Sequence, residues 1–352
     1  MTKIRVGIIG QGRSGYGIHT HTLPQLPDLF EIAAVADPLE DRMKEARGLG
    51  AKGYTDYRDM LGQKDIDLII NATPSHLHVP VTLECLGAGF NTMTEKPAAR
   101  RASDVDRIVA AARKKGKVLA FFQQSRYAPY FQQVRKVIAS GVLGRPVMIK
   151  IAFNGFGRRW DWQTIQEYNG GNLLNTGPHP LDQALQLFGT DVMPGVFCRM
   201  DRAVTYGDAE DQVKLILSGT GRPTIDVEIS SCAAYPSATY QVYATQGGLT
   251  GTMDHVEWKY FIPADAPKHS LRREPMEGRA YCQEPLSWLT GSWDSPKDSP
   301  PLFDTMAIAL YRNLHGALTE GTPLDVKAEE VRLQIAVIEE CHRQNPLKRM
   351  RE

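Results

Sequence analysis

Two short polar segments of the chain carry side chains that could move a proton. The first is Thr94-Glu95-Lys96-Pro97, which begins at the end of the run 89–94. We expect a strand within that run, so Lys96 would lie at the carboxyl end of a strand, where ligands of such sheets bind. An amine in such a crevice can hydrogen-bond a hydroxyl, and burial can bring its pKa towards neutrality. Taken alone, a lysine in a strand-to-helix loop is more often a surface residue.

The second segment spans residues 170–182 and holds three polar side chains at helical spacing. Asn175, His179 and Asp182 are four and three residues apart, so on one helix they would share a face. Prolines follow Thr176, and because proline is tolerated in a first helical turn, we expect the helix to begin near there. A histidine held by polar neighbours can act as a general base, or it can be a structural residue beside a capping aspartate.

The elements that must position these groups begin with a glycine-rich turn near the N-terminus. The apolar run 3–9 leads directly into Gly10-Gln11-Gly12-Arg13-Ser14-Gly15, and a second apolar run, 32–37, ends in an acid. This is the dinucleotide-binding pattern. Gly10 permits the tight turn, Gly12 lets a pyrophosphate approach the backbone, and Gly15 lets the helix pack closely on the sheet. The helix N-terminus then favours the negative pyrophosphate.

Asp37 bears on the choice of nucleotide. A carboxylate at the end of the second strand accepts hydrogen bonds from a ribose diol and repels a 2′-phosphate, so the sequence favours NAD over NADP. Arg42 argues the other way, because its side chain could reach back to a phosphate. We also assign Arg13, Ser14 and His78 to the cofactor site.

The pattern of the whole chain predicts two domains. Strand-like and helix-like segments alternate through residues 1–122, which predicts an α/β domain with a doubly wound parallel sheet of the Rossmann type. From residue 123 onwards, β-rich stretches follow at 146–155, 196–206, 213–217, 225–234, 238–244 and 256–262. They predict an α+β domain, 123–352, with a large, mostly antiparallel open sheet.

Alternation within these strands leaves one face of the predicted sheet half polar, either solvated or covered by another subunit. Residues 264–302 are rich in proline, serine and charge, and we expect them to be irregular. Two closing helices, 303–320 and 329–344, could pack back onto the first domain.

Composition restricts the class of protein. The 352 residues include 41 basic and 40 acidic ones without a long basic run, so we expect neither a nucleic-acid partner nor a membrane surface. The five cysteines are scattered without a C-x-x-C pair, which is typical of reduced thiols in the cytoplasm, and we expect no metal. Because the chain enters its first strand at once, we expect no signal peptide.

Taken together, the motifs resemble the Gfo/Idh/MocA oxidoreductase family. The glycine turn, Asn71-Ala72-Thr73-Pro74, Glu95-Lys96-Pro97 and the G-G-x-L-x-N-x-G-x-H-x-x-D run all resemble that family, in order and spacing, over the whole chain. The resemblance implies an NAD-dependent dehydrogenase that transfers a hydride between nicotinamide and a secondary hydroxyl of a sugar, glycoside or cyclitol. Oxidation of a glucoside 3-hydroxyl is one candidate reaction. A homodimer or homotetramer is implied as well.

The resemblance also implies roles for single residues. Lys96 would be the catalytic lysine and His179 the acid/base. The family often has aspartate where this chain has Asn175; an amide orients a hydroxyl but takes no proton, so Lys96 and His179 would share proton transfer. The residues implied to contact the cofactor are Thr73 and Pro74 beside the nicotinamide ribose, Glu95 at a ribose, and Lys96.

Fewer residues can be assigned to substrate binding. Trp160 and Trp162 precede the histidine segment and could pack against the C–H faces of a sugar, or they could belong to ordinary core or interface packing. Arg126 and Tyr127 are assigned to the substrate together with Asn175 and His179. Two other functions fit the same scaffold: NAD-assisted glycoside cleavage by transient oxidation and elimination, and a non-catalytic regulator that senses NAD or sugar.

Overall fold

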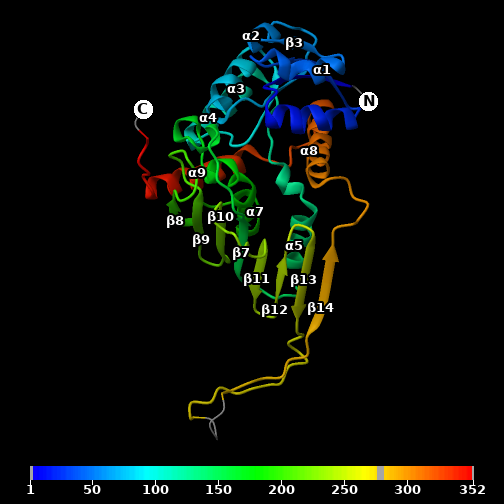
Figure 1. Ribbon diagram of the computed structural model, residues 1–352. Coiled ribbons are helices and arrows are strands. Elements are labelled where there is room, and N and C mark those ends of the chain that lie inside the picture. The colour runs from blue at the N-terminus through cyan, green and yellow to red at the C-terminus, as the bar shows by residue number, and fades with distance from the viewer. Residues whose placement is uncertain (1–2, 276–280, 351–352) are drawn as a thin grey trace.

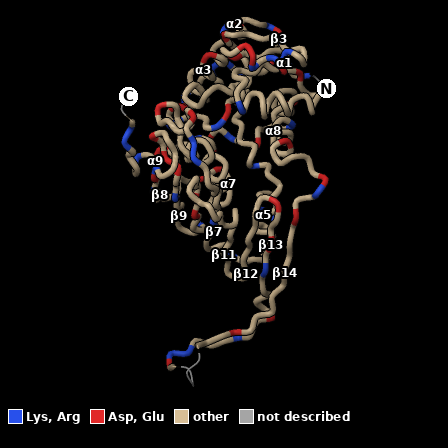
Figure 2. Tube along the Cα trace, in the orientation of Figure 1, with Lys and Arg blue, Asp and Glu red and all other residues tan. Residues whose placement is uncertain are grey.

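A computed structural model describes residues 3–275 and 281–350 of the chain. It shows two lobes built on two separate sheets, with the N-terminal lobe above the C-terminal one in Figure 1. Lys and Arg are interspersed with Asp and Glu over both lobes (Figure 2). Within the described ranges, no helix is both long enough and apolar enough to cross a bilayer.

The first lobe contains a six-stranded parallel sheet in the order β3-β2-β1-β4-β5-β6, so the predicted doubly wound sheet is confirmed. Its strands are β1 (Ile4–Ile9), β2 (Phe30–Ala36), β3 (Lys52–Tyr54), β4 (Leu68–Asn71), β5 (Asn91–Thr94) and β6 (Leu119–Phe121). The order reverses between β1 and β4, and ligands bind in the crevice that opens at such a point. The glycine turn after β1 and the loop after β4 meet there: the N–H of Ala72 donates to the carbonyl of Ile9 at 2.8 Å.

Helices cover both faces of this sheet. They are η1 (Gly15–Thr20), a π-helical stretch, and α1 (Lys44–Gly48), α2 (Tyr57–Met60), α3 (His78–Gly87) and α4 (Ala102–Lys115). Side chains on one face pack with α8 (Leu302–Thr319), which belongs to the C-terminal part of the chain. Ala307, Leu310 and Leu314 of α8 share a buried cluster with Ile4 and Val6 of β1. A late segment therefore completes the core of the first lobe.

The second lobe contains an eight-stranded sheet in the order β14-β13-β12-β11-β7-β10-β9-β8. Neighbouring strands are antiparallel except for β7 and β10, so the predicted mostly antiparallel sheet is confirmed. Its strands are β7 (Pro146–Asn154), β8 (Gly195–Asp201), β9 (Gln212–Ser218), β10 (Thr224–Ser230), β11 (Tyr240–Ala244), β12 (Gly247–Gly251), β13 (His255–Tyr260) and β14 (Leu289–Asp294).

Two strands of this sheet were not anticipated. β12 has the sequence GGLTG, and glycine has a low strand propensity. β14 lies within the stretch 264–302 that was expected to be irregular, so that expectation is wrong for residues 289–294. β13 pairs with β12 on one side and with β14 on the other, and β12 also pairs with β11. Such pairing is a tertiary effect that local composition does not reveal.

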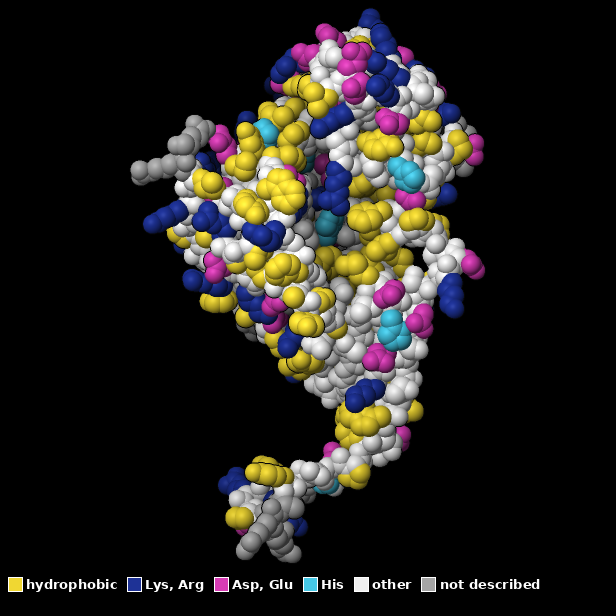
Figure 3. Space-filling model, viewed as in Figure 1, with side chains coloured by type: hydrophobic (Ala, Val, Ile, Leu, Met, Phe, Trp, Pro, Cys, Tyr) yellow, Lys and Arg dark blue, Asp and Glu magenta, His cyan; other side chains and the backbone are white. Residues whose placement is uncertain are grey.

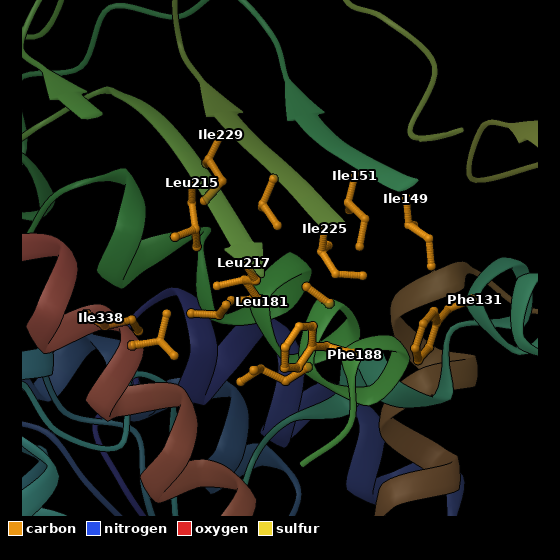
Figure 4. Close-up of a cluster of buried hydrophobic side chains, with 14 of the residues drawn as sticks. Phe131, Ile149, Ile151, Leu181, Phe188, Leu215, Leu217, Ile225, Ile229 and Ile338 are labelled. Carbon is orange, nitrogen blue, oxygen red and sulfur yellow. The ribbon is translucent and has the colours of Figure 1, made fainter. Parts of the chain in front are cut away.

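Three helices cover one face of the second sheet: α5 (Pro129–Ala139), α7 (Pro178–Phe188) and α9 (Ala328–Gln344). Alternate strand residues point towards them, as Figure 4 shows for Ile149, Ile225 and Leu215 facing Phe188 and Ile338. Because strand side chains alternate, the other residues of β7, β9 and β10 face outward.

The outward face of the second sheet carries ion pairs. The ammonium of Lys214 lies 2.6 Å from an oxygen of Asp226 and 3.2 Å from an oxygen of Glu228. The prediction that this face is half polar is confirmed. Whether water or a second subunit covers it stays a prediction.

Candidate active site

The glycine turn after β1 is tightly packed on one side and open on the other. Gly10 has a φ of +90°, and a Cβ there would lie 2.5 Å from the carbonyl oxygen of Ala72. A Cβ on Gly15 would lie only 1.8 Å from the carbonyl oxygen of Gly10. A Cβ on Gly12, in contrast, would meet no heavy atom of the described chain within 4 Å apart from its immediate neighbours. The turn thus leaves room for a pyrophosphate at Gly12, and Arg13 and Ser14 follow at the start of the helix.

Asp37 is held across this turn. One carboxylate oxygen accepts from the backbone N–H of Gln11 at 2.8 Å, and the other accepts from the N–H of Leu39 at 2.9 Å. A carboxylate has about four acceptor positions, so further positions remain for ribose hydroxyls. The guanidinium of Arg42 lies 3.7 Å from Asp37, so in this structure it pairs with the acid.

The loop after β4 is organised by Asn71 and His78. The side chain of Asn71 accepts from the hydroxyl of Thr73 at 2.7 Å and donates to the carbonyl of His78 at 2.9 Å. Thr73 is half-buried and Pro74 is exposed, so both are accessible to a ligand. His78 itself is buried, with Nδ1 2.7 Å from the carbonyl of Pro97 and Nε2 2.8 Å from the carbonyl of Thr73. The assignment of His78 to the cofactor is therefore corrected: both ring nitrogens are used to join two loops.

Lys96 reaches from the first lobe to the second. It follows β5, its bond to Pro97 is cis, and its Nζ donates to the backbone carbonyl of Asn175 at 2.9 Å. Burial lowers the pKa of Lys96, and the nearby charges of Arg13 and Arg159 lower it further, although Glu95 opposes them. The lowered pKa favours the neutral amine, which can accept a proton.

His179 lies at the start of α7, with Nδ1 3.2 Å from the hydroxyl oxygen of Ser125. Burial lowers the pKa of His179 to about 3, and the charge of Lys96 contributes to this shift. The surface between the two lobes is hollowed, and histidine and basic side chains gather in the hollow (Figure 3).

Asn175 and His179 do not share one helix, contrary to the spacing argument. α6 (Asn172–Asn175) is a separate turn that ends before α7 begins. Pro178 and Pro180 have no N–H, so the ladder of helical hydrogen bonds is interrupted between α6 and α7. Asp182 lies on α7 but binds Arg126.

Asn175 is also fixed through its side chain. Its Oδ1 accepts from the amide of Gln163 at 3.1 Å, and Gln163 in turn accepts from the guanidinium of Arg159. This chain of contacts links the loop of Trp160 and Trp162 to Lys96. Trp162 is half-buried and Trp160 is 80% exposed, so the outer ring is free to meet a ligand or another surface.

Arg126 and Tyr127 serve a structural role, and their assignment to the substrate is corrected. The guanidinium of Arg126 is buried, donates to both oxygens of Asp182, and also reaches Glu330 at 2.5 Å. The hydroxyl of Tyr127 donates to Asp325 at 2.8 Å. The polar atoms of both side chains are thus occupied in joining residues 126 and 127 to α7, to α9 and to the loop before α9.

Glu95 faces into the protein, whereas the sequence analysis had assigned it to a ribose of the cofactor. It is 3% exposed, and one oxygen lies 3.2 Å from Nε2 of His19, which is itself fully buried in η1. Burial alone would raise the pKa of Glu95, but the contact with His19 and the charges of Lys96 and His78 together outweigh burial and bring the pKa to about 2. The other oxygen accepts from the backbone N–H of Lys96 at 2.9 Å. Glu95 therefore supports the backbone that carries Lys96.

The sequence reasoning did not anticipate the roles of three residues behind or beside the site. Nδ1 of His19 lies 2.7 Å from the hydroxyl of Tyr311, which comes from α8. No local signal marks His19 or Tyr311, because their partners lie in distant segments. Gln163 could have been suspected from its place between aromatic residues before the histidine segment.

Comparison with known proteins gives matches along most of the chain. Residues 4–123 match the GFO/IDH/MocA model described as an oxidoreductase family with an NAD-binding Rossmann fold, and residues 131–250 match the C-terminal domain model of the same group. The scyllo-inositol 2-dehydrogenase (NADP(+)) IolW of Bacillus subtilis is 26% identical, covering 96% of this chain and 92% of its own. An inositol 2-dehydrogenase of Salmonella typhimurium is 30% identical over 64% of this chain and 67% of its own.

Solved structures share the fold. The putative oxidoreductase yvaA from Bacillus subtilis has a TM-score of 0.80 at 21% identity, covering 98% of both chains. The WlbA dehydrogenase from Bordetella pertussis, solved in complex with NADH and UDP-GlcNAcA, has a TM-score of 0.77 at 22% identity and covers 98% of this chain and 97% of its own.

Alanine in place of Gly15 or of Gly12 should affect the protein in different ways. Gly15→Ala should lower the melting temperature, because its Cβ would collide with the turn. Gly12→Ala should fold normally but weaken NADH binding by about tenfold or more, a change of about 1.4 kcal/mol. Thermal melts and fluorescence titration with NADH check both variants. Unchanged NADH affinity in Gly12→Ala would show that the pyrophosphate does not lie there.

The Arg126 network generates a stability prediction. Arg126→Gln leaves Asp182 buried without its cation, and breaking such a buried pair costs about 3–5 kcal/mol. The matched control is Arg107→Gln, which breaks an exposed pair with Asp104 and should cost at most about 1 kcal/mol. Urea unfolding measures both, and equal small losses would contradict the structural role of Arg126.

Proposed function

The chain belongs to the GFO/IDH/MocA family of NAD-binding oxidoreductases, and we propose that it oxidises or reduces a secondary alcohol of a sugar, glycoside or cyclitol. The observation that carries the proposal is the contact between the lobes, where Nζ of Lys96 meets the backbone of Asn175 beside His179. The amine of Lys96, which follows β5 at the carboxyl edge of the nucleotide-binding sheet, thus reaches the segment that leads to His179.

The glycine turn provides the fit for NAD. Open space at Gly12 and the helix start at Arg13 and Ser14 suit the pyrophosphate, and Asp37 suits a ribose diol. Thr73 and Pro74 are accessible beside this turn and would line the nicotinamide ribose. When bound, NAD supplies the nicotinamide ring that exchanges a hydride with the alcohol carbon.

Lys96 is the group best placed to take the hydroxyl proton. Its carbonyl partner at Asn175 fixes the direction of Nζ, and its lowered pKa makes the ammonium easier to deprotonate. His179 is neutral because its pKa is low, and Ser125 lies against Nδ1, so Nε2 is the nitrogen that can bond a substrate hydroxyl. Asn175 orients these groups and transfers no proton.

Cyclitols and glycosides are the substrate classes to test first. Two inositol dehydrogenases are among the relatives, which supports a cyclitol. The exposed ring of Trp160 and the half-buried Trp162 would suit the C–H face of a pyranose, which supports a glycoside oxidised at its 3-hydroxyl. A homodimer or homotetramer that covers the half-polar sheet face is part of the same proposal.

Removal of the Lys96 amine tests the proposal directly. Lys96→Ala should lower turnover by about 10²–10⁴ because the general base is lost, while NADH binding stays within a few-fold. Lys114→Ala, at the exposed end of α4, is the matched control and should retain full turnover. The measurement is NADH absorbance during oxidation of a panel of inositols and glucosides with NAD⁺ or NADP⁺. Near-normal turnover of Lys96→Ala on any accepted substrate would overturn the assignment.

The shifted pKa values predict a simple pH profile. The pKa of Lys96 is lowered but the group must lose its proton to act as base, so kcat/KM for oxidation should rise as pH increases through that pKa. His179 stays neutral above pH 3 and should add no inflection between about pH 5 and 10. A second inflection near neutrality that vanishes in His179→Asn would show instead that His179 titrates in the working enzyme.

A further inference from the structure

A long arm leaves the second lobe between β13 and β14. We define the arm as residues 263–288, of which 263–275 and 281–288 are described. Figure 1 shows it extending well beyond the rest of the molecule. Nearly all of its described side chains are exposed, and Leu271 and Tyr281 are 91% and 94% exposed. Large apolar side chains presented so fully to water mark a surface that meets a partner.

Contacts within the described arm are few and lie at its surface. At its base, the rings of Phe261 and Trp288 meet edge to face at 5.9 Å. Further out, His269 lies 3.2 Å from Glu284, and such exposed pairs contribute little stability. Ordering two extended segments is costly in conformational entropy, so contacts of this kind do not account for a fixed arm. A second surface would supply the missing contacts.

A suitable surface lies at the foot of the arm. The outward face of β11 to β14 forms a groove of about 780 Å³. Its floor has small side chains, such as Gly248, Thr250 and Ser292, and Tyr243 and Glu257 are also among its lining residues. The outer arm carries the basic residues Arg272 and Arg273, and the groove offers the acid of Glu257, beside which Lys259 also lines the groove.

We propose that the arm of one copy of this chain lies in the groove of a second copy, and that the second copy reciprocates. Figure 1 shows the arm running away from β11–β14 of its own chain, so the groove that we assign to it is that of another copy. An interface of this type closes on itself, because the same two surfaces are used twice. The inference rests on the proposed self-association and names the segment that produces it.

Sedimentation of the full chain and an arm-shortened chain tests the exchange. Replacing residues 263–287 with Asn-Gly keeps the Phe261–Trp288 contact at the base and should weaken self-association by at least about tenfold for each anchor lost. NADH affinity and the melting temperature of the core show that the shortened chain is folded. If the shortened chain self-associates as tightly as the full chain, the arm exchange is wrong and self-association stands. If the full chain is a monomer, both are wrong.

Point substitutions provide a milder version of the same test. Leu271→Asp combined with Tyr281→Asp should weaken self-association without changing the fold, because both side chains are exposed in one copy. The control is Val192→Asp, an exposed apolar residue before β8 at the opposite edge of the sheet. Equal effects of the double variant and the control would contradict a specific role for the arm.

Cys282 allows the docking site to be located. It is exposed, whereas Cys85, Cys198 and Cys341 are buried, so a thiol-reactive photo-crosslinker can be attached there once Cys232 is replaced by serine. In a mixture of ¹⁴N- and ¹⁵N-labelled copies, we expect mass spectrometry to find mixed-isotope links from Cys282 to β11–β14. Links confined to a single copy, or mixed links only to other surfaces, would overturn the proposed arrangement.

Discussion

The hydrogen bond from Lys96 to the carbonyl of Asn175 is the contact on which the proposed site depends, because its two atoms belong to different lobes. A small rotation of one lobe would separate the amine from the imidazole, and catalytic groups lose much of their effect when misplaced by about an ångström. The lobes are therefore held by buried polar contacts near the site. Gln334 of α9 accepts from Gln123 at 2.6 Å and donates to the carbonyl of Pro178 at 2.7 Å, next to His179.

The electrostatics of Lys96 result from opposing effects. Burial and two arginines favour the neutral amine, and the carboxylate of Glu95 favours the ammonium. One oxygen of Glu95 lies 3.2 Å from Nε2 of His19, on the side of the loop that faces η1. The first lobe thus provides a buried acid that anchors the backbone of Lys96 while leaving its amine able to lose a proton. Three elements of the chain, η1, β5 and α8, meet at this point.

Local features of the site could be predicted from the sequence, and tertiary ones could not. The glycine turn, the acid after β2 and the lysine after β5 follow from short-range patterns, and the structure places Lys96 where its strand predicts. The roles of Arg126, His78 and Glu95 depend on partners far away in the chain, so residue type alone suggested ligand contacts that the structure uses for support. The break between Asn175 and His179 follows from Pro178 and Pro180, which lack the N–H groups of a continuous helix, and residue spacing alone does not reveal it.

The position of α8 has a consequence for how the chain is made. The N-terminal sheet leaves the ribosome long before α8, which covers one of its apolar faces. At a synthesis rate of about 5–20 residues per second, the residues between 122 and 302 occupy the ribosome for roughly 10 to 40 s. During that interval Ile4, Val6 and Phe30 lack the cover that Leu310 and Tyr311 later provide. The nascent N-terminal half accordingly exposes one apolar face of its sheet until α8 has been made.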